Sequence, residues 1–303
     1  MLSLFKRFFL IVSLFIRKIY NSIYYCAVGN DKFIVINAWL IQWGNKITPR
    51  NFGDDLNFYL ISELSGKKVI TISNIFHSRK MLSLMCVGSL LEYCYDSVTV
   101  WGSGSMYGDV NRFQDKPLDV RAVRGPLSRK YLLSLNVPCP AVYGDPALLL
   151  PKIYRPHHVE KKWRIGIIPH ISDLNNSTMI NFKRENPEVA IIKLNKYDVW
   201  TDVIDEIVAC DIILSSSLHG LIISDAYDVP NVWIKLSDKV EGNGFKFKDY
   251  FLSVDRNIES PVTINCVNDF IYAIRQCDNY KKIIWDYRPL LESCPFVLKK
   301  DII

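Results

Sequence analysis

The sequence predicts an α/β protein with two Rossmann-like domains, preceded by a basic amphipathic N-terminal segment. The chain has 303 residues, 49% of them apolar, which is enough for one large core or two ordinary ones. Short apolar runs of strand length alternate with helical periodicity, a pattern typical of parallel sheets with helical crossovers. This alternation breaks once, at the prolines and charges of residues 151–163. We therefore expect domains at residues 31–155 and 156–303, the second ending in helices.

Residues 1–30 form the predicted N-terminal segment. Its uncharged apolar run, residues 8–16, is flanked on each side by two cations. A membrane span needs roughly 20 apolar residues, and a signal peptide normally offers a small-residue cleavage site, so neither fits well. We expect residues 1–28 to lie as a helix on the anionic inner face of the cell membrane, removable without loss of the fold. The alternative is a helix that packs on the protein itself.

The composition indicates a cytoplasmic protein with a modest positive charge. The 37 Lys and Arg against 31 Asp and Glu give a formal charge of +6. This suits anionic ligands or anionic lipid and does not indicate nucleic-acid binding. The eight cysteines are scattered through apolar surroundings, without a C-x-x-C pair or a histidine at ligand spacing. We expect them to be reduced and buried, with no metal site.

The first domain is expected to alternate strands with two helices. Strand-length apolar runs occupy residues 32–40, 67–72, 81–88, 97–101, 118–123 and 141–144. Helical periodicity occupies residues 55–64, where Asp54 and Asp55 are placed to cap free N–H groups. A second helix is expected at residues 126–135, where Pro126 suits the first helical position.

The second domain repeats this pattern. Its expected strands are residues 164–170, 189–195, 212–214 and 231–236. Helices are expected at residues 197–210, which carry an apolar stripe at helical spacing, and at residues 218–228. Ligands of such sheets bind beyond the carboxyl ends of the strands, and here also in the cleft between two domains.

The turn "SSSLHG", residues 215–220, is the first candidate site. A strand ending before it and a helix beginning at Leu218 would leave unpaired N–H groups, the positive end of the helix dipole and three hydroxyls in the turn. This combination suits a phosphate or a carboxylate. His219 would lie in the first helical turn beside that anion. A serine cap with a core-facing histidine is the alternative.

Two arginines, Arg121 and Arg124, lie at or near the end of a predicted strand and form the second candidate site. Gly125 provides the turn that leads into the next helix. A cation beside a helix N-terminus is unfavourable unless an anion or a carboxylate intervenes. Arg124 is therefore expected either to bind an anionic ligand or to form an internal salt bridge.

Two further stretches follow predicted strands. His170 lies just past the strand that opens the second domain and would face the same cleft as His219, although a lone histidine there is often structural. The loop "WGSGSMYG" contains Gly102, Ser103 and Gly104. It has neither the spacing of a dinucleotide loop nor the lysine of a P-loop. It either approaches a ligand closely or is a simple turn.

Seven stretches, in order along the chain, resemble the polysaccharide pyruvyl transferase family. They are "NFGDDLNFYL", "WGSGS", "VRAVRGPLSRKYL", "YGDPALLLP", "IGIIPH", "SSSLHGLIISDAYDVPNVW" and "GFKFKDYF". Together they span about two thirds of the chain. The resemblance implies a GT-B-like arrangement of the two domains and a place in the assembly of a bacterial surface polysaccharide, such as an exopolysaccharide or capsule.

The resemblance also implies a reaction. A pyruvyl group would pass from phosphoenolpyruvate, used as donor substrate without any cofactor, to two hydroxyls of a sugar that is free or lipid-linked, giving a ketal. This chemistry needs a general acid, a base, and cations or N–H donors for two anionic groups. His219 is the candidate acid and His170 the candidate base or acceptor-binding residue. The candidate substrate-binding residues are Arg121, Arg124, Ser215, Ser216, Ser217, Gly102, Ser103, Gly104, Asn51, Asp54 and Lys235.

One departure from the family pattern affects the donor site. Some family members have an arginine directly before the Leu-His pair, where this chain has Ser217. The donor anion would then be held by Arg124 or Lys235, or the donor differs. The alternative functions are a GT-B-type glycosyltransferase that uses a nucleotide sugar, and a non-catalytic, membrane-tethered sugar-binding partner of a polysaccharide assembly complex.

Overall fold

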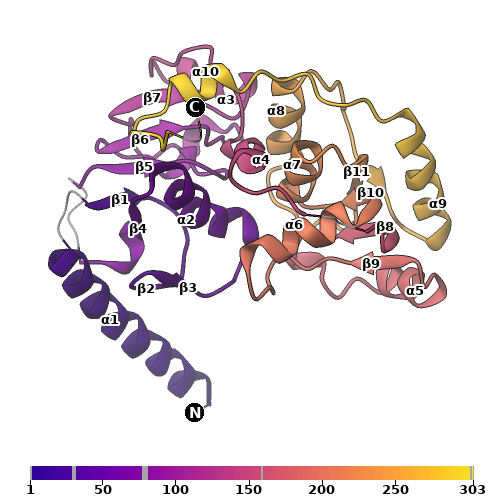
Figure 1. The fold of residues 1–303 in the computed structure, drawn as a ribbon, viewed down its shortest axis with the longest axis horizontal. Coiled ribbons are helices and arrows are strands. Elements are labelled where there is room, and N and C mark those ends of the chain that lie inside the picture. The colour runs from indigo at the N-terminus through magenta and orange to yellow at the C-terminus, as the bar shows by residue number, and fades with distance from the viewer. Residues whose placement is uncertain (1, 29–31, 77–80, 158–159, 301, 303) are drawn as a thin grey trace.

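Two parallel β-sheets, one from each half of the chain, form the framework of the computed structural model (Figure 1). The structure describes residues 2–28, 32–76, 81–157, 160–300 and 302. The predicted α/β class is confirmed, and the two sheets are compatible with two Rossmann-like domains. The boundary between residues 155 and 156 stays a prediction.

The first sheet has the strand order β4-β1-β5-β6-β7, and every neighbouring pair is parallel. Its strands are β1 (Phe33–Ile36), β4 (Lys68–Thr71), β5 (Ser83–Met85), β6 (Val98–Trp101) and β7 (Asp119–Ala122). A short hairpin of β2 (Gln42–Trp43) and β3 (Lys46–Ile47) lies beside it. The expected strand at residues 141–144 forms only an isolated bridge between Val123 and Tyr143.

Both helices predicted in the first half are present; the second begins at the predicted residue, and the first begins three residues before its predicted start. Helix α2 (Phe52–Ser65) has Asn51 as its N-cap, and the Asp55 carboxylate accepts hydrogen bonds from the backbone N–H groups of Arg50 and Asn51. Helix α3 (Pro126–Ser134) has its proline in the first turn. The short α4 (Leu150–Ile153) then leads toward the second half.

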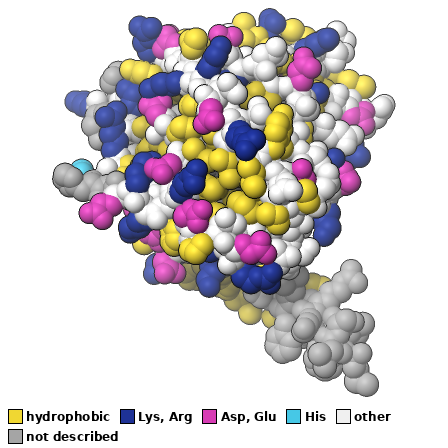
Figure 2. Space-filling model, turned by 90° about the vertical axis from the view of Figure 1, so that its right-hand side faces the viewer, with side chains coloured by type: hydrophobic (Ala, Val, Ile, Leu, Met, Phe, Trp, Pro, Cys, Tyr) yellow, Lys and Arg dark blue, Asp and Glu magenta, His cyan; other side chains and the backbone are white. Residues whose placement is uncertain are grey.

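The second sheet has the order β12-β11-β10-β8-β9 and is also parallel. Its strands are β8 (Trp163–Ile168), β9 (Val189–Ile191), β10 (Cys210–Ser215), β11 (Asn231–Lys235) and β12 (Val262–Thr263). The helices of this half are α5 (Ser177–Glu185), α6 (Trp200–Val208), α7 (Leu218–Ala226), α8 (Phe245–Ser253), α9 (Val267–Gln276) and α10 (Arg288–Glu292). Figure 2 shows hydrophobic side chains near the centre of one face, with charges of both signs around them.

The C-terminal residues return to the first sheet. The indole nitrogen of Trp101, at the end of β6, donates a 2.9 Å hydrogen bond to the carbonyl of Leu290, and its ring contacts Phe296 edge to face. The backbone N–H of Lys299 donates to the carbonyl of Leu64 at the end of α2. A continuous hydrophobic core therefore includes residues of both halves of the chain.

Helix α1 (Leu2–Val28) projects from the first sheet in Figure 1. The fully buried Asn21 donates to the carbonyls of Gln42 and Asn74 and accepts from the N–H of Gly44. The C-terminal half of α1 thus packs on the first half of the chain, which is the alternative that the sequence left open. That residues 1–28 can be removed without loss of the fold stays a prediction, and the burial of Asn21 argues against it. Among the described residues, no helix is both long and apolar enough to cross a membrane.

The cysteines follow the prediction in part. All eight are free thiols, and five of them are buried. Cys26 on α1 and Cys266 at the start of α9 are exposed instead. Burial raises the pKa of several of these thiols, for example that of Cys139 to about 11, so they remain protonated at neutral pH.

Candidate active site

A cavity of about 210 Å³ lies between the two halves of the chain, at the carboxyl ends of strands from both sheets. The first half contributes the loops after β1, β5 and β6, and the N-cap and first turn of α2. The second half contributes the loops after β8 and β9 and the first turns of α7 and α8. The lining residues are Trp39, Asn51, Asp54, Gly88, Ser89, Leu90, Tyr93, Met106, Pro169, His170, Ile171, Leu194, Ser217, Leu218, His219 and Lys246.

His219 lies in the first turn of α7, two residues after the N-cap Ser217. Its Nε2 atom is 4.0 Å from Oδ2 of the fully buried Asp145, and neither atom has a hydrogen-bond partner among the described residues. Burial, together with the charges of Lys246 and Arg124, lowers the pKa of His219 to about 3. Burial also raises the pKa of Asp145 to about 7. At neutral pH the pair is therefore a neutral imidazole facing a carboxyl group close to half-protonation.

The backbone of α2 touches the His219 ring. A Cβ atom placed on Gly53, in the first turn of α2, would lie 1.9 Å from Nδ1 of His219. No side chain fits between the helix and the ring at this point, so glycine is required for the close approach. The first half of the chain thereby limits where the imidazole of the second half can lie.

Lys246, in the first turn of α8, is the only Lys or Arg among the described residues that line the cavity. Burial, together with the charge of Arg124, lowers its pKa to about 8, although the Asp54 carboxylate opposes the shift. Burial and the neighbouring Asp55 raise the pKa of Asp54 to about 6. At neutral pH the cavity therefore contains a buried ammonium group that is still mostly charged, in surroundings where its attraction for an anion is strong.

His170 follows β8 and contacts the Ser-rich turn. Its backbone N–H donates to the Ser216 hydroxyl at 2.9 Å, and its Nδ1 lies 2.7 Å from the Ser172 hydroxyl. Burial lowers the pKa of His170 to about 4, and the charge of Lys246 adds to this effect. The neutral ring can accept a proton or a hydrogen bond from a ligand hydroxyl.

The Ser-rich turn has the predicted placement, after β10 and before α7. Only Ser217 of the three serines lines the cavity. The buried Ser215 hydroxyl donates to the carbonyls of Ile168 and Ser217, and the Ser216 hydroxyl holds His170. The first two hydroxyls thus stabilise the turn, while the turn as a whole presents the N-terminus of α7 to the cavity.

Arg124 is fully buried and does not line the cavity. Its guanidinium pairs with the buried Asp249 at 3.1 Å and donates to the Ser89 hydroxyl and the Ser105 carbonyl, both at 2.6 Å. The salt-bridge alternative is what the structure shows, and the expectation of direct anion binding is corrected. Its contact with Ser89, which does line the cavity, makes Arg124 a support for that wall.

In the glycine loop, Gly102, Ser103 and Gly104 support the wall, and Met106 lines the cavity. A Cβ on Gly104 would lie 2.3 Å from Cζ of Arg124, and one on Gly102 would lie 2.3 Å from the Pro146 ring. The buried Ser103 hydroxyl donates to the carbonyl of Gly88. Gly88 follows β5 and lines the cavity. The loop is a tight turn that lets Arg124 pack closely.

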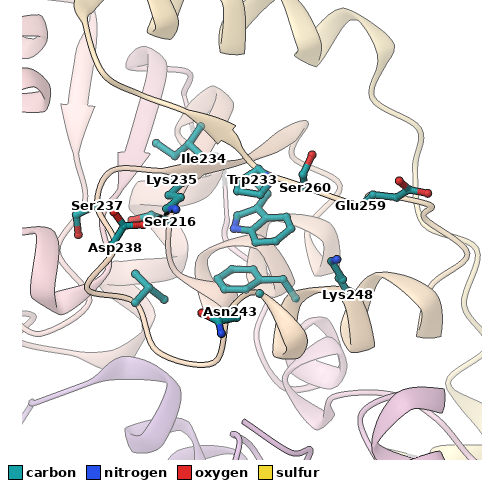
Figure 3. A pocket seen from close by; sticks show the side chains of 14 residues that line it. Ser216, Trp233, Ile234, Lys235, Ser237, Asp238, Asn243, Lys248, Glu259 and Ser260 are labelled. Carbon is teal, nitrogen blue, oxygen red and sulfur yellow. Dashed lines mark ion pairs between the residues drawn. The ribbon is translucent and has the colours of Figure 1, made fainter. Parts of the chain in front are cut away.

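Two predicted residues lie elsewhere. Arg121 is exposed and pairs with Asp119 on the same strand, because residues two apart in a strand point to the same face. Lys235 pairs with Asp238 and lines a separate cavity of about 350 Å³, next to the stacked rings of Trp233 and Phe247 (Figure 3). Neither residue reaches the cavity that contains His219.

Reasoning from sequence missed Asp145, Lys246 and Ser89 as site residues. Asp145 and Lys246 lie in the quoted stretches "YGDPALLLP" and "GFKFKDYF", where a charge interrupts an aromatic or aliphatic run. That interruption was the available signal for both. For Ser89, in the loop after β5, no comparable signal exists.

Comparison with known proteins identifies a family and two relatives. A sequence model described as polysaccharide pyruvyl transferase matches residues 11–238. The chain is 25% identical over 205 residues to the uncharacterized protein L143 of Acanthamoeba polyphaga mimivirus, covering 66% of this chain and 69% of that protein. It is 27% identical over 206 residues to the succinoglycan biosynthesis protein ExoV of Rhizobium meliloti, covering 66% of this chain and 60% of that protein.

Proposed function

Since the chain belongs to the polysaccharide pyruvyl transferase family, we propose that it transfers a pyruvyl group from phosphoenolpyruvate to two hydroxyls of a saccharide acceptor. The similarity to a succinoglycan biosynthesis protein supports a bacterial surface polysaccharide, or its lipid-linked precursor, as the acceptor. We also propose a GT-B-like arrangement, because strands of both sheets end at one shared cavity.

The donor would lie between Lys246 and the N-terminus of α7. Phosphoenolpyruvate carries a carboxylate and a phosphate, and both need cations or N–H donors. Lys246 supplies the cation, and the first turn of α7 supplies N–H groups and the positive end of a helix dipole. In this chain Lys246 would therefore take the place of the arginine that some relatives have at the Ser217 position.

His219 would deliver the proton that starts the reaction. Burial keeps its imidazole neutral, but the negative charges of the donor favour the imidazolium form. Asp145, 4.0 Å away, stabilises that cation once its own proton is lost. Proton transfer to the methylene carbon of phosphoenolpyruvate creates a methyl group and an oxocarbenium-like centre on the neighbouring carbon.

The acceptor hydroxyls then react in turn with that centre. The first hydroxyl forms a C–O bond and gives its proton to the neutral His170. The bond between that carbon and the bridging phosphate oxygen then breaks, and phosphate leaves with the bonding electron pair. The second hydroxyl attacks the same carbon and closes the ketal. Of the two hydroxyl protons, one restores to His219 the proton that it gave to the methyl group. The other leaves with the phosphate.

The observation that carries this proposal is the buried Lys246 beside His219 in a cavity shared by both halves. Calorimetric titration of phosphoenolpyruvate into the wild type and Lys246→Met tests it. A lost charge-assisted contact should weaken binding by more than about tenfold. Lys235→Met is the matched control, because Lys235 lines the separate cavity, and its affinity should match the wild type.

Other results would overturn the proposal. Titration of UDP-glucose in parallel distinguishes the glycosyltransferase alternative: binding of UDP-glucose without binding of phosphoenolpyruvate would favour it. Binding of neither compound would favour a non-catalytic sugar-binding partner. Weakened binding in Lys235→Met, with normal binding in Lys246→Met, would place the donor in the other cavity.

We further propose that α1 holds the protein on an anionic membrane surface, at the cytoplasmic face of the cell membrane. The face of α1 opposite Asn21 exposes Phe15, Ile16, Ile19 and Ile23. Residues 1–28 include four cations and no acidic residue, which complements an anionic surface. Because the fold uses Asn21, the test replaces exposed residues and leaves the helix in place.

The double variant Ile19→Glu, Ile23→Glu should lose cosedimentation with vesicles of phosphatidylglycerol and phosphatidylcholine. Its thermal unfolding should be unchanged, because both side chains are exposed. A double variant that still sediments with the vesicles would show that α1 is not the membrane-binding element.

A further inference from the structure

Two aromatic side chains at the edge of the catalytic cavity are exposed to solvent. Trp39 is 57% exposed and Tyr93 is 41% exposed, and both line the cavity that contains His170, His219 and Lys246. Their ring centroids are 6.1 Å apart and their planes are inclined at 80°. Large aromatic surfaces at the rim of a charged cavity are typical of a ligand-binding groove.

The backbone under both rings is held by buried polar groups. On the Trp39 side, the Thr71 hydroxyl donates to the carbonyl of Ala38, and the Asn74 amide donates to the carbonyl of Leu40. Both donors are buried. The residues on either side of Trp39 are therefore fixed, so the ring is presented to solvent from a rigid loop.

Tyr93 is held in a similar way. Its backbone N–H donates to the carbonyl of Leu90 at 2.9 Å. The preceding residue, Glu92, is buried, and its carboxylate accepts from the N–H groups of Met106 and Tyr107. Both rings are therefore held in exposed positions by a rigid backbone, so little conformational freedom is lost when a ligand binds to them.

The charge distribution separates this rim from the donor position. The faces of aromatic rings carry partial negative charge, which disfavours a small, highly anionic molecule such as phosphoenolpyruvate. The only Lys or Arg among the described lining residues is Lys246. A pyranose ring, in contrast, offers C–H groups with partial positive charge on its faces and hydroxyls on its edge, and so matches aromatic faces beside polar groups.

We propose that Trp39 and Tyr93 form the binding platform for the saccharide acceptor. This inference rests on the proposed function and adds to it the residues that hold the acceptor. Asn51 and Asp54, from the first turn of α2, line the same cavity and provide hydrogen-bonding groups for ring hydroxyls. An acceptor stacked on the rim would direct its hydroxyls into the cavity, toward His170.

Binding of methyl β-galactoside and methyl β-glucoside tests the platform without requiring turnover. Saturation-transfer NMR would compare the full-length wild type with Trp39→Ala, Tyr93→Ala and Trp39→Phe. We expect the alanine variants to bind at least one glycoside about tenfold more weakly and Trp39→Phe to recover most of the affinity. Tyr272→Ala is the matched control, because Tyr272 on α9 is also 57% exposed and lies outside the cavity.

Phosphoenolpyruvate titrations on the same variants separate this inference from the proposed function. Normal donor affinity with weakened glycoside binding in the alanine variants supports the platform. Glycoside binding equal to wild type in both alanine variants, or no glycoside binding to the wild type, overturns it. Weakened donor binding with unchanged glycoside binding would assign the rim to the donor and also overturns it. Failure of the wild type to bind phosphoenolpyruvate contradicts the proposed function alone.

Discussion

Replacing Gly53 with alanine tests whether the position of His219 controls turnover. The new Cβ atom would lie 1.9 Å from Nδ1 of His219. Ordinary contact requires a separation of about 3.5 Å, so the ring or helix α2 must move by about 1.5 Å. Misplacing a reacting group by about 1 Å can lower a rate by about 10²-fold. We therefore expect turnover to fall by about that factor.

Stability should respond differently from turnover. Alanine is a better helix residue than glycine by about 1 kcal/mol, which offsets part of the cost of the new contact. We expect a small change in Tm, measured by circular dichroism. Turnover would be followed by phosphate release from phosphoenolpyruvate in the presence of a saccharide acceptor.

The matched control for Gly53→Ala is Glu63→Ala, on the exposed face of the same helix. It should leave both turnover and Tm unchanged. Wild-type turnover in Gly53→Ala would refute the reasoning, because it would show that the reaction tolerates a displaced imidazole or does not use it.

Three further predictions concern the buried groups around the cavity. His219→Gln should lower turnover by about 10²–10⁴-fold with little change in phosphoenolpyruvate affinity or Tm, because glutamine keeps hydrogen-bonding capacity but cannot transfer a proton; near-normal turnover would remove His219 from the mechanism. Arg124→Ala should lower the free energy of unfolding in urea by about 3–5 kcal/mol, because it leaves the buried Asp249 carboxylate without its cation; weaker donor binding without destabilisation would show a direct binding role instead. The raised pKa of Asp145 makes the folded state retain a proton that the unfolded state loses above its ordinary pKa of 3.8, so this group makes stability fall as the pH rises toward 7. Asp145→Asn should remove that fall and leave the opposite contribution of His219, whose lowered pKa makes stability rise between about pH 3 and 6.5; an unchanged profile in urea unfolding would contradict the assignment of Asp145.

The local sequence was sufficient to predict most elements of the sheets and the turns that follow them. Apolar runs predicted five strands of the first sheet and four of the second, and the expected strand at residues 141–144 was wrong. The two-residue β12 is too short to produce a period. The Ser-rich turn, with His219 just inside helix α7, follows from short-range signals alone, because a strand end and a helix start are encoded in adjacent residues.

The long-range partners of polar residues were decided only by the tertiary structure. A cation at a helix N-terminus predicts a nearby negative group, but the sequence does not show whether that group is a ligand or Asp249, which lies 125 residues from Arg124. Amphipathic periodicity predicts helix α1, yet the partners of Asn21 lie in the β2–β3 hairpin, at residues 42 and 44, and at residue 74. In both cases the local sequence predicted the element correctly, but the role of its polar residue was decided by distant residues.

The same holds for the composition of the cavity. Lys246 and His219 line the cavity, while Gly53 and Asp145 lie against the His219 ring. These residues come from four separate segments, and only His219 stands out in its own segment. Folding brings them together because all strands of each sheet run parallel, so the segments after the strands meet at one edge. Burial then shifts the pKa values of Asp145, Lys246 and His219, and this burial depends on every segment packed around them and not only on their neighbours in sequence.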